Sequence, residues 1–257
     1  MSHWDQYSNW EEAEADWDLQ AKRASEERPL KVLKSFPKME GITRDTAQGL
    51  KWKSFYWMVA KDKGFSILKS VLKKPFVHAF RYLKSLFSSS SFRREGDFFY
   101  YGIQNEEQFR ALLKRDDTLL LLGFSYCHKP FECPSGRFSD QCIKDLSNPV
   151  CRQCFIGKAS HAAPKQRVIP VYIPTVHDIG RKVFELIQHH PDRQIVFLIT
   201  ACEMTLTMFA DWGNLAGIVG VGVRLDGRIC NTMRAFKLSE EGIKPGLTVV
   251  LDETQKK

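Results

Sequence analysis

The second half of the chain alternates short apolar runs with segments of helical periodicity, and this pattern restricts the fold more than any other feature. Pro170 favours a sheet edge for the strand that contains it, because proline cannot donate to a ladder. Residues 176–190 and 204–212 are expected to form helices between strands. The alternation predicts an α/β domain with a mainly parallel sheet and flanking helices. The strand candidates are residues 116–126, 167–174, 194–200 and 217–225.

Two further segments complete the expected domain, which covers residues 96–257. Asn105 and Gln108 form a capping pair for a helix whose apolar residues continue at helical spacing. Residues 247–252 are a last strand candidate, expected to close the sheet. The connection between the first two strands has little periodicity, and its length is unusual for a loop unless something organises it. We therefore expect a long Cys-rich loop held by a bound group.

The net charge of +8 is concentrated in one short segment. Residues 51–95 carry eleven basic and two acidic side chains, whereas residues 1–50 carry seven basic and ten acidic ones. Residues 96–257 are nearly neutral, with twenty basic and eighteen acidic side chains. A basic domain of the kind that binds nucleic acid over its whole surface is therefore not indicated.

Residues 1–50 are predicted to be a disordered acidic tail. Trp4, Trp10 and Trp17 stand among acidic residues with little else apolar, so the segment cannot offset its ordering entropy by itself. The alternative is an arm that docks on a partner or on the chain's own basic segment. The first twenty residues hold six acidic groups and no Lys or Arg, unlike a secretory signal. Since no apolar run is long enough to cross a bilayer, we expect a cytoplasmic protein.

Residues 51–95 are predicted to be a basic amphipathic helical segment that Pro75 divides. Phe76, Phe80 and Leu83 repeat at helical spacing. The first interpretation is a helix that covers the α/β domain and keeps its lysines outward. The second is contact with an anionic membrane surface, which would make the protein peripheral to the membrane. Nucleic-acid binding ranks third.

All seven cysteines lie between Cys127 and Cys230. In a reducing compartment, clustered thiols indicate a metal site or catalysis before disulfides. Three of them follow expected strands and form what we call the strand-end set, because ligands gather beyond the carboxyl ends of parallel strands. The other four lie in the long connection and form the loop set, which includes a CxxC motif suited to one ion or cluster. The strand-end set is Cys127, Cys202 and Cys230, and the loop set is Cys133, Cys142, Cys151 and Cys154.

Other polar residues beside the cysteines are weaker candidates. His128 could be a ligand or a proton carrier, and Glu203 is better placed for either role because it lies at a strand end. Asn231 and Thr232 follow Cys230 and could donate a hydrogen bond to a sulfur or a substrate. Cys202 and Cys142 could instead be small buried hydrophobes, since free cysteine is among the most buried residue types.

The segments LLLLGFSYC, CRQCFIGKA, ITACEM and GVRLDGRICNT resemble the family called domain of unknown function 116. The resemblance covers about residues 100–255 and depends on the order and spacing of these motifs. The family pattern has a further cysteine three residues before its CxxC; that position is Asn148 here, and Cys142 is the nearest substitute. The family has no settled reaction. The resemblance implies a metal-binding role for Cys127, Cys133, Cys151, Cys154, Cys202 and Cys230.

The residues support three hypotheses of different classes. The first is an iron–sulfur protein with a redox or sulfur-handling role. Its primary ligands would be Cys127, Cys133, Cys151 and Cys154, and the remaining strand-end thiols would complete the site or face a substrate. The second is a zinc-stabilised binding module held at a membrane or a partner by residues 51–95. The third is thiol catalysis without a metal, through one hyper-reactive cysteine. The sequence assigns no substrate or reaction.

Overall fold

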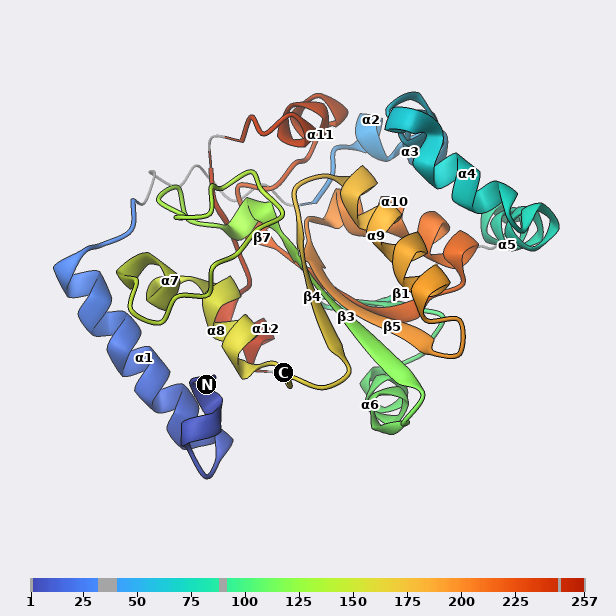
Figure 1. Cartoon of the computed structure of the whole chain (residues 1–257). Helices are drawn as coiled ribbons and strands as arrows, with labels where there is room; N and C mark the ends of the chain where they lie inside the picture. Colours follow the sequence, from blue (N-terminus) through green and yellow to red (C-terminus); the bar gives the residue numbers. More distant parts are fainter. Residues whose placement is uncertain (1, 32–40, 88–91, 245, 257) are drawn as a thin grey trace.

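The computed structural model describes residues 2–31, 41–87, 92–244 and 246–256 (Figure 1). The strands of its central sheet are β1 (Arg93–Glu95), β2 (Phe98–Tyr101), β3 (Thr118–Ser125), β4 (Val168–Ile173), β5 (Gln194–Ala201) and β6 (Val219–Arg224). Their order in the sheet is β1–β2–β6–β5–β3–β4. The four strands from β6 to β4 are parallel, and β2 and β1 continue the sheet antiparallel beyond β6. The mainly parallel α/β fold expected from the sequence is confirmed.

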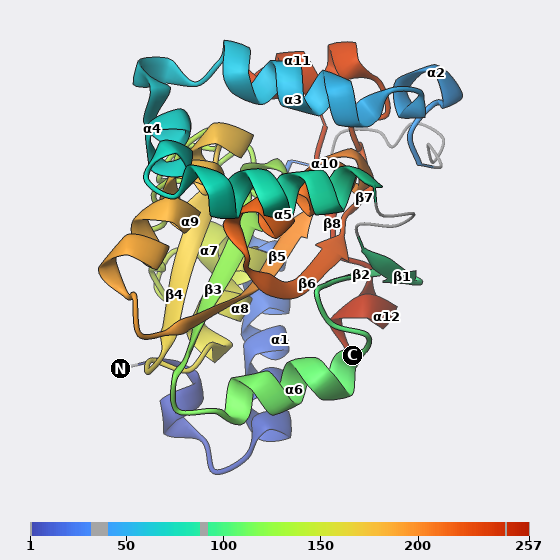
Figure 2. The ribbon, with the colours of Figure 1, turned by 90° about the vertical axis from the view of Figure 1, so that its right-hand side faces the viewer.

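The helices are η1 (Trp4–Gln6), α1 (Trp10–Glu27), α2 (Arg44–Ala47), α3 (Leu50–Ala60), η2 (Lys63–Phe65), α4 (Ser66–Leu72), α5 (Pro75–Phe87), α6 (Glu106–Lys114), η3 (Tyr126–His128), α7 (Pro149–Gln153), α8 (Phe155–Ala162), α9 (Val176–His189), α10 (Glu203–Ala216), α11 (Met233–Glu240) and α12 (Asp252–Gln255). Helices α9 and α10 cover one face of the sheet, and α3, α4 and α5 pack outside them (Figures 1 and 2). The opposite face carries α6 and α8, with α1 and α7 further out.

Strand β3 is buried on both faces, which explains its continuous apolar run. Leu121 packs in the core beneath α9 and α10, whereas Leu122 and Phe124 pack in the core beneath α8. Successive side chains of a strand point to opposite faces, so both sets of alternate positions must be apolar here. As expected, β4 lies at the sheet edge, where Pro170 pairs in register with Leu122.

Two features of the sheet differ from the sequence expectation. The aromatic run of β2 was not predicted to be a strand, yet it pairs antiparallel with β6 from Phe98 to Tyr101. The expectation that residues 247–252 close the sheet is wrong. Within them, β8 (Thr248–Val249) pairs only with β7 (Asp226–Gly227), in a separate two-stranded sheet. Because β2 already occupies the outer edge of β6, no edge remains there for β8.

The N-terminal segment differs from the expected disordered tail, since α1 packs against α7. Trp17 is 2 % exposed, and the Arg152 guanidinium lies 4.7 Å from the centre of its ring. Lys158 Nζ lies 2.8 Å from a carboxylate oxygen of both Glu14 and Asp18. The apolar content of the segment alone gave no sign of this docking, because its partners belong to the Cys-rich region more than 100 residues away. Residues 32–40 lie outside the described part of the chain.

The basic segment is divided at Pro75, as expected, since α4 ends at Leu72 and α5 begins at the proline. Helix α5 packs against α10, and α4 packs against α9, so the segment covers the α/β domain in agreement with the first interpretation. The Ser run that follows lies outside the described residues. Among the helices of the described chain, none combines the length and apolar character needed to cross a membrane.

Replacing Trp17 with alanine should release α1 from the domain. Removal of a buried Trp side chain costs about 3 kcal/mol or more, which corresponds to roughly a hundredfold higher population of the undocked helix. Trypsin cleavage at Lys22 and Arg23 should accelerate accordingly, and mass spectrometry of the early fragments would measure it. Leu19→Ala, at a half-exposed position of the same helix, should leave the rate nearly unchanged. Equal cleavage of the two variants would contradict the docking of α1 through Trp17.

Candidate functional site

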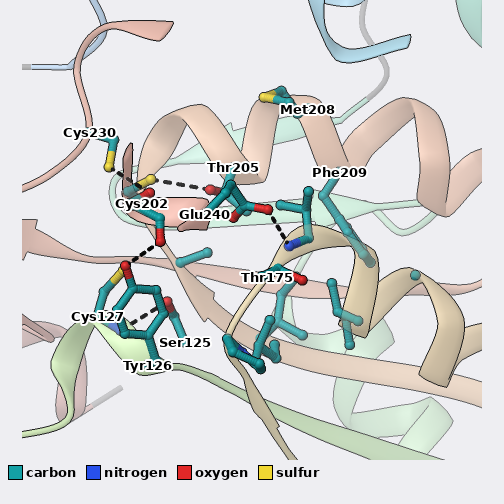
Figure 3. A pocket seen from close by; sticks show the side chains of 18 of the residues that line it. Ser125, Tyr126, Cys127, Thr175, Cys202, Thr205, Met208, Phe209, Cys230 and Glu240 are labelled. Atoms are coloured by element: carbon teal, nitrogen blue, oxygen red, sulfur yellow. Dashed lines mark hydrogen bonds between the residues drawn. The ribbon is translucent and has the colours of Figure 1, made fainter. Parts of the chain in front are cut away.

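The strand-end set converges at the carboxyl edge of the sheet, as the sequence predicted (Figure 3). Cys127 lies in η3 directly after β3, and Cys202 is the N-cap of α10 directly after β5. Cys230 follows the loop beyond β6, and its thiol is hydrogen-bonded to the sulfur of Cys202. All three side chains line one cavity of about 70 Å³. Parallel pairing of β3, β5 and β6 places these residues together despite their separation in sequence.

Lys244 supplies a buried positive charge to this group. Its side chain is 7 % exposed, and its Nζ donates to Cys230 Sγ at 3.3 Å. Burial opposes the ammonium, but the neighbouring thiols raise the pKa of Lys244 overall. A buried ammonium is stable only beside compensating negative charge, so this arrangement favours a thiolate.

The surroundings favour Cys202 as the position of that thiolate. The hydrogen bond from Cys230 lowers the pKa of Cys202 well below the ordinary thiol value, and the Lys244 charge acts in the same direction against burial. The same hydrogen bond, together with burial, raises the pKa of Cys230, while burial raises that of Cys127. The N-terminus of α10 also favours an anion at the Cys202 position. The group thus combines one thiol of lowered pKa with two thiols of raised pKa.

The cavity beside these thiols is mostly apolar, with a few polar groups at its rim. Helices α3, α9 and α10 contribute its apolar walls, while Thr175 and Glu240 contribute polar atoms. Burial raises the pKa of Glu240 to about 8, and its carboxyl accepts a hydrogen bond from Val176 N at 2.9 Å. Glu240 therefore joins α11 to the first turn of α9 and is mainly protonated at neutral pH.

The loop set surrounds a different and smaller cavity. Cys133, Cys142, Cys151 and Cys154 all line it, in a volume of about 20 Å³. Lys129 is 1 % exposed and organises the loop, because its Nζ donates to the carbonyl oxygens of Ser139 and Gln141 and to the Ser139 hydroxyl. Burial lowers the pKa of Lys129, while its thiol neighbours Cys133, Cys142 and Cys154 oppose this shift.

The CxxC segment has the backbone geometry of a ligand loop. The backbone N–H groups of Ile156 and Gly157 donate to the sulfur of Cys154, although burial still raises the pKa of that thiol to about 12. Asp145 N donates to the sulfur of Cys151, whose pKa burial also raises. A Cβ at Gly157 would lie 2.3 Å from the Cys151 carbonyl oxygen, so only glycine permits this close approach.

The structure therefore separates the seven cysteines into the two sets, and it does not bring together the expected primary ligands. Cys127 lines the strand-end cavity, whereas Cys142 lines the loop cavity with Cys133, Cys151 and Cys154. Cys142, suggested by the family pattern only as a substitute for the missing cysteine, is a full member of the loop group.

The weaker candidates lie outside both cavities. His128 is buried with its Nε2 2.9 Å from Thr200 Oγ1, and burial lowers its pKa to about 3, so it is neutral. Glu203 forms an ion pair with Arg94 at 3.0 Å and is not among the described residues that line the strand-end cavity. Thr232 is the N-cap of α11, where its hydroxyl accepts from Ala235 N. The Asn231 carbonyl accepts from Thr43 N. These contacts give His128, Glu203 and Thr232 partners within the fold, whereas the contact of Asn231 involves only its backbone.

Sequence reasoning missed the three charged side chains that organise the sites: Lys129, Lys244 and Arg137. Arg137 donates to the carbonyl oxygens of Cys127, Lys244 and Gly246, and thereby ties the Cys-rich loop to the C-terminal segment. Lys129 follows the strand-end Cys127 by two residues, a proximity that could have drawn attention to it. Nothing local in the sequence distinguishes Lys244 from the other lysines.

Among the residues that the structure describes, no group of three or more His, Cys, Asp or Glu side chains is placed to hold a metal ion. Comparisons of the chain with protein-family models, with curated proteins and with solved structures gave no match. Its function must therefore be inferred from the two thiol sites and the surfaces around them.

Glu240→Gln should make stability less dependent on pH. The folded-state pKa of Glu240 is raised above its unfolded value of about 4.3, so its stabilising contribution is full below that pH and is lost as the pH rises through about 8. Between pH 5 and pH 9, the unfolding free energy of the parent chain should fall by on the order of 3 kcal/mol more than that of the variant. Urea titrations at both pH values measure the difference.

Glu241→Gln is the matched control, because Glu241 is exposed and adjacent. It should show the parent's pH dependence. If Glu240→Gln and Glu241→Gln respond alike to pH, the buried protonated carboxyl is not present.

Proposed function

We propose that the chain is an iron–sulfur protein whose cluster is bound by the loop set, Cys133, Cys142, Cys151 and Cys154. The observation that carries this proposal is that four thiols from a long connection line one cavity. Four cysteine thiolates are the usual ligands of [2Fe–2S] and [4Fe–4S] clusters. The resemblance to the family called domain of unknown function 116 agrees with a metal-binding role, although it favoured Cys127 over Cys142.

The surroundings of the loop set suit bound thiolates. Backbone N–H groups already donate to the sulfurs of Cys151 and Cys154, and such hydrogen bonds stabilise ligated thiolates and adjust cluster potentials. The buried Lys129 ammonium lies near three of the four thiols and offsets part of their negative charge when they ionise. These contacts would support four thiolates in a site that otherwise excludes charge.

Metal binding would have to draw the four sulfurs into ligand positions, as is common where a metal organises a loop. One tetrahedral Zn²⁺, with Zn–S bonds of about 2.3 Å, needs its sulfurs only about 3.8 Å apart. A cluster has metal and sulfide atoms between its thiolates and accepts wider spacing. The number of clustered thiols and the family resemblance are the grounds on which we place the iron–sulfur cluster first and a zinc-stabilised loop second.

The function we propose is electron transfer or sulfur handling, since a bound cluster supplies one-electron redox chemistry. The strand-end set would then face the substrate. Its activated Cys202 and its protonated neighbours line a separate cavity with mainly apolar walls. A nucleophilic thiolate of this kind is better suited to reaction with a sulfur-containing substrate than to a purely structural role.

Iron, acid-labile sulfide and zinc should be measured in the full chain purified without air. We expect iron and sulfide in stoichiometric amounts with a visible absorption band. Cys142→Ser and Cys151→Ser should each lower bound iron severalfold or more, because each removes one of four ligands. Cys202→Ser, in the strand-end set, is the matched control and should retain the parent's iron content.

A measurement of stoichiometric zinc without iron would favour the zinc-stabilised loop over the iron–sulfur cluster. Colourless protein with no bound metal, obtained anaerobically, would contradict both. Loss of iron in Cys127→Ser, with retention in Cys142→Ser, would contradict the loop set as the ligand group.

A second candidate function is peripheral contact with an anionic membrane, which the outer surface of α3–α5 favours. Eleven of the eighteen exposed large apolar side chains among the described residues lie between Trp52 and Leu83. On α3 and α5 these exposed side chains repeat at helical spacing and form an apolar stripe along each helix, in which Phe55 also packs against Trp212. Figure 2 shows α3 and α5 on the same side of the molecule. The stripes are Trp52, Phe55, Tyr56 and Val59 on α3, and Phe76, Val77, Phe80 and Leu83 on α5.

The charges of this surface are almost entirely positive. Asp62, the one acidic residue between positions 50 and 87, is 8 % exposed and accepts hydrogen bonds from the backbone of Ile67 and Leu68. Exposed basic residues flank the stripes, including Lys61, Lys69 and Lys74. Bulky aromatic side chains bordered by lysines are typical of helices that lie in the interface of an anionic bilayer.

The double variant Phe76→Ser with Phe80→Ser should bind vesicles of phosphatidylglycerol at least about tenfold more weakly than the parent, because partial burial of two Phe side chains exceeds 1.4 kcal/mol. Vesicle sedimentation measures this, and added salt should weaken binding of both proteins. Leu19→Ser, on the acidic helix α1, is the control and should bind like the parent. Equal binding to phosphatidylcholine vesicles, or no effect of the double variant, would contradict membrane contact.

A further inference from the structure

A third cavity, much larger than either thiol cavity, lies on the opposite face of the sheet from α9 and α10. Its volume is about 480 Å³, and no cysteine lines it. The sheet contributes its floor through Leu198 and Val221, and helices α6 and α8 contribute Phe109 and Phe155. Trp4 and Trp10 of the N-terminal segment line it as well, so the docked segment forms one wall.

This space is far larger than a packing defect. Protein interiors are close-packed, and gaps larger than a water molecule are few. An apolar cavity of about 150 Å³ is already large enough to bind benzene. The present volume falls within the range of about 300–1,000 Å³ that is usual for small-molecule sites. The cavity therefore has the size and the apolar lining of a ligand site.

The charged residues at the cavity are paired with one another. Lys158 Nζ lies 2.8 Å from both Glu14 and Asp18, and Arg110 lies 2.6 Å from Glu106. The two cations that line the cavity, Lys158 and Arg110, are thus each paired with a carboxylate that also lines it, Glu14 or Glu106. An anionic head group entering here would have to displace one of these carboxylates to gain a cation, whereas an uncharged molecule would leave both pairs intact.

One hydrogen-bond donor at the cavity lacks a partner. The indole N–H of Trp4 is buried, and no acceptor within the described residues pairs with it. The Trp10 indole, by contrast, donates to the Glu14 carboxylate. A buried unsatisfied donor costs free energy that a ligand oxygen would recover. Trp4 thus places an unpaired donor in the wall of this apolar cavity.

We propose that this cavity binds an uncharged, mainly aliphatic molecule that carries a hydrogen-bond-accepting oxygen, such as a long-chain alcohol or ester. Apolar walls would bury the chain, and the Trp4 indole would donate to the oxygen. Helix α8 separates this site from the loop set. Phe155 and Ala159 line this cavity, whereas Ile156 and Gly157 line the cavity of the loop set. The proposal is therefore independent of the proposed metal.

Displacement of the neutral dye Nile red by 1-decanol and by decanoate at pH 8 tests the proposal on the full chain. We expect decanol to displace the dye at least about tenfold more effectively than decanoate, because both lining cations are already paired and burial of the carboxylate would cost its hydration. Ala159→Trp, which fills the cavity from α8, should lower decanol affinity at least about tenfold. Ala60→Trp adds the same side chain at an exposed position on α3 and should leave the affinity unchanged.

Trp4→Phe keeps an aromatic ring and removes the indole N–H donor. This variant therefore tests the proposed ligand site even if Ala159→Trp fails to fold. It should weaken decanol binding between about threefold and tenfold, while Trp52→Phe on α3 should not change it. The proposal is overturned if decanol does not bind or decanoate binds as tightly. It is also overturned if Trp4→Phe has no effect, or if the Phe76→Ser and Phe80→Ser variant abolishes binding, which would assign the dye to the exposed stripes.

Discussion

Parallel pairing of β3, β5 and β6 is the constraint on which both thiol sites depend. It brings three strand ends to one edge, so that residues following those strands meet although up to 103 positions separate them. The parallel pairing of β3 with β4 in the same sheet requires a long crossover between these two strands, because parallel neighbours cannot be joined by a tight turn. That crossover carries the loop set. One feature of the sheet thus creates a thiol group at its edge and a second one in the connection beside it.

Each thiol group contains a buried lysine, and the two lysines act differently. Lys129 donates to loop carbonyl oxygens and fixes the shape of the connection, whereas Lys244 donates directly to Cys230. The first would support a set of metal-bound thiolates, and the second favours a free thiolate at Cys202. This contrast in chemistry is why we assign metal binding to one group and substrate contact to the other.

The sequence was sufficient for the parts of the fold that depend on local periodicity. The run before Cys127, the edge strand with Pro170 and the cap at Asn105 are all found where the pattern placed them. The sequence was also sufficient to divide the cysteines into two sets, because strand ends and a long loop can be recognised from the order of residues along the chain. The sequence was insufficient where contacts between residues far apart in the chain determine the structure. Trp17 packs against Arg152 and His161, which lie more than 100 residues away in the chain, and Cys142 joins the loop set only because the folded loop brings it there.

The central claim is that the seven cysteines act as two separate groups, of which the loop set binds metal. Alkylation rates of each cysteine, measured by mass spectrometry with and without a strong chelator under anaerobic conditions, test it most directly. The account predicts that the chelator accelerates alkylation of Cys133, Cys142, Cys151 and Cys154 and leaves the rates of Cys127, Cys202 and Cys230 unchanged. Protection of Cys127 together with the CxxC cysteines, or a chelator effect spread over all seven, would contradict it.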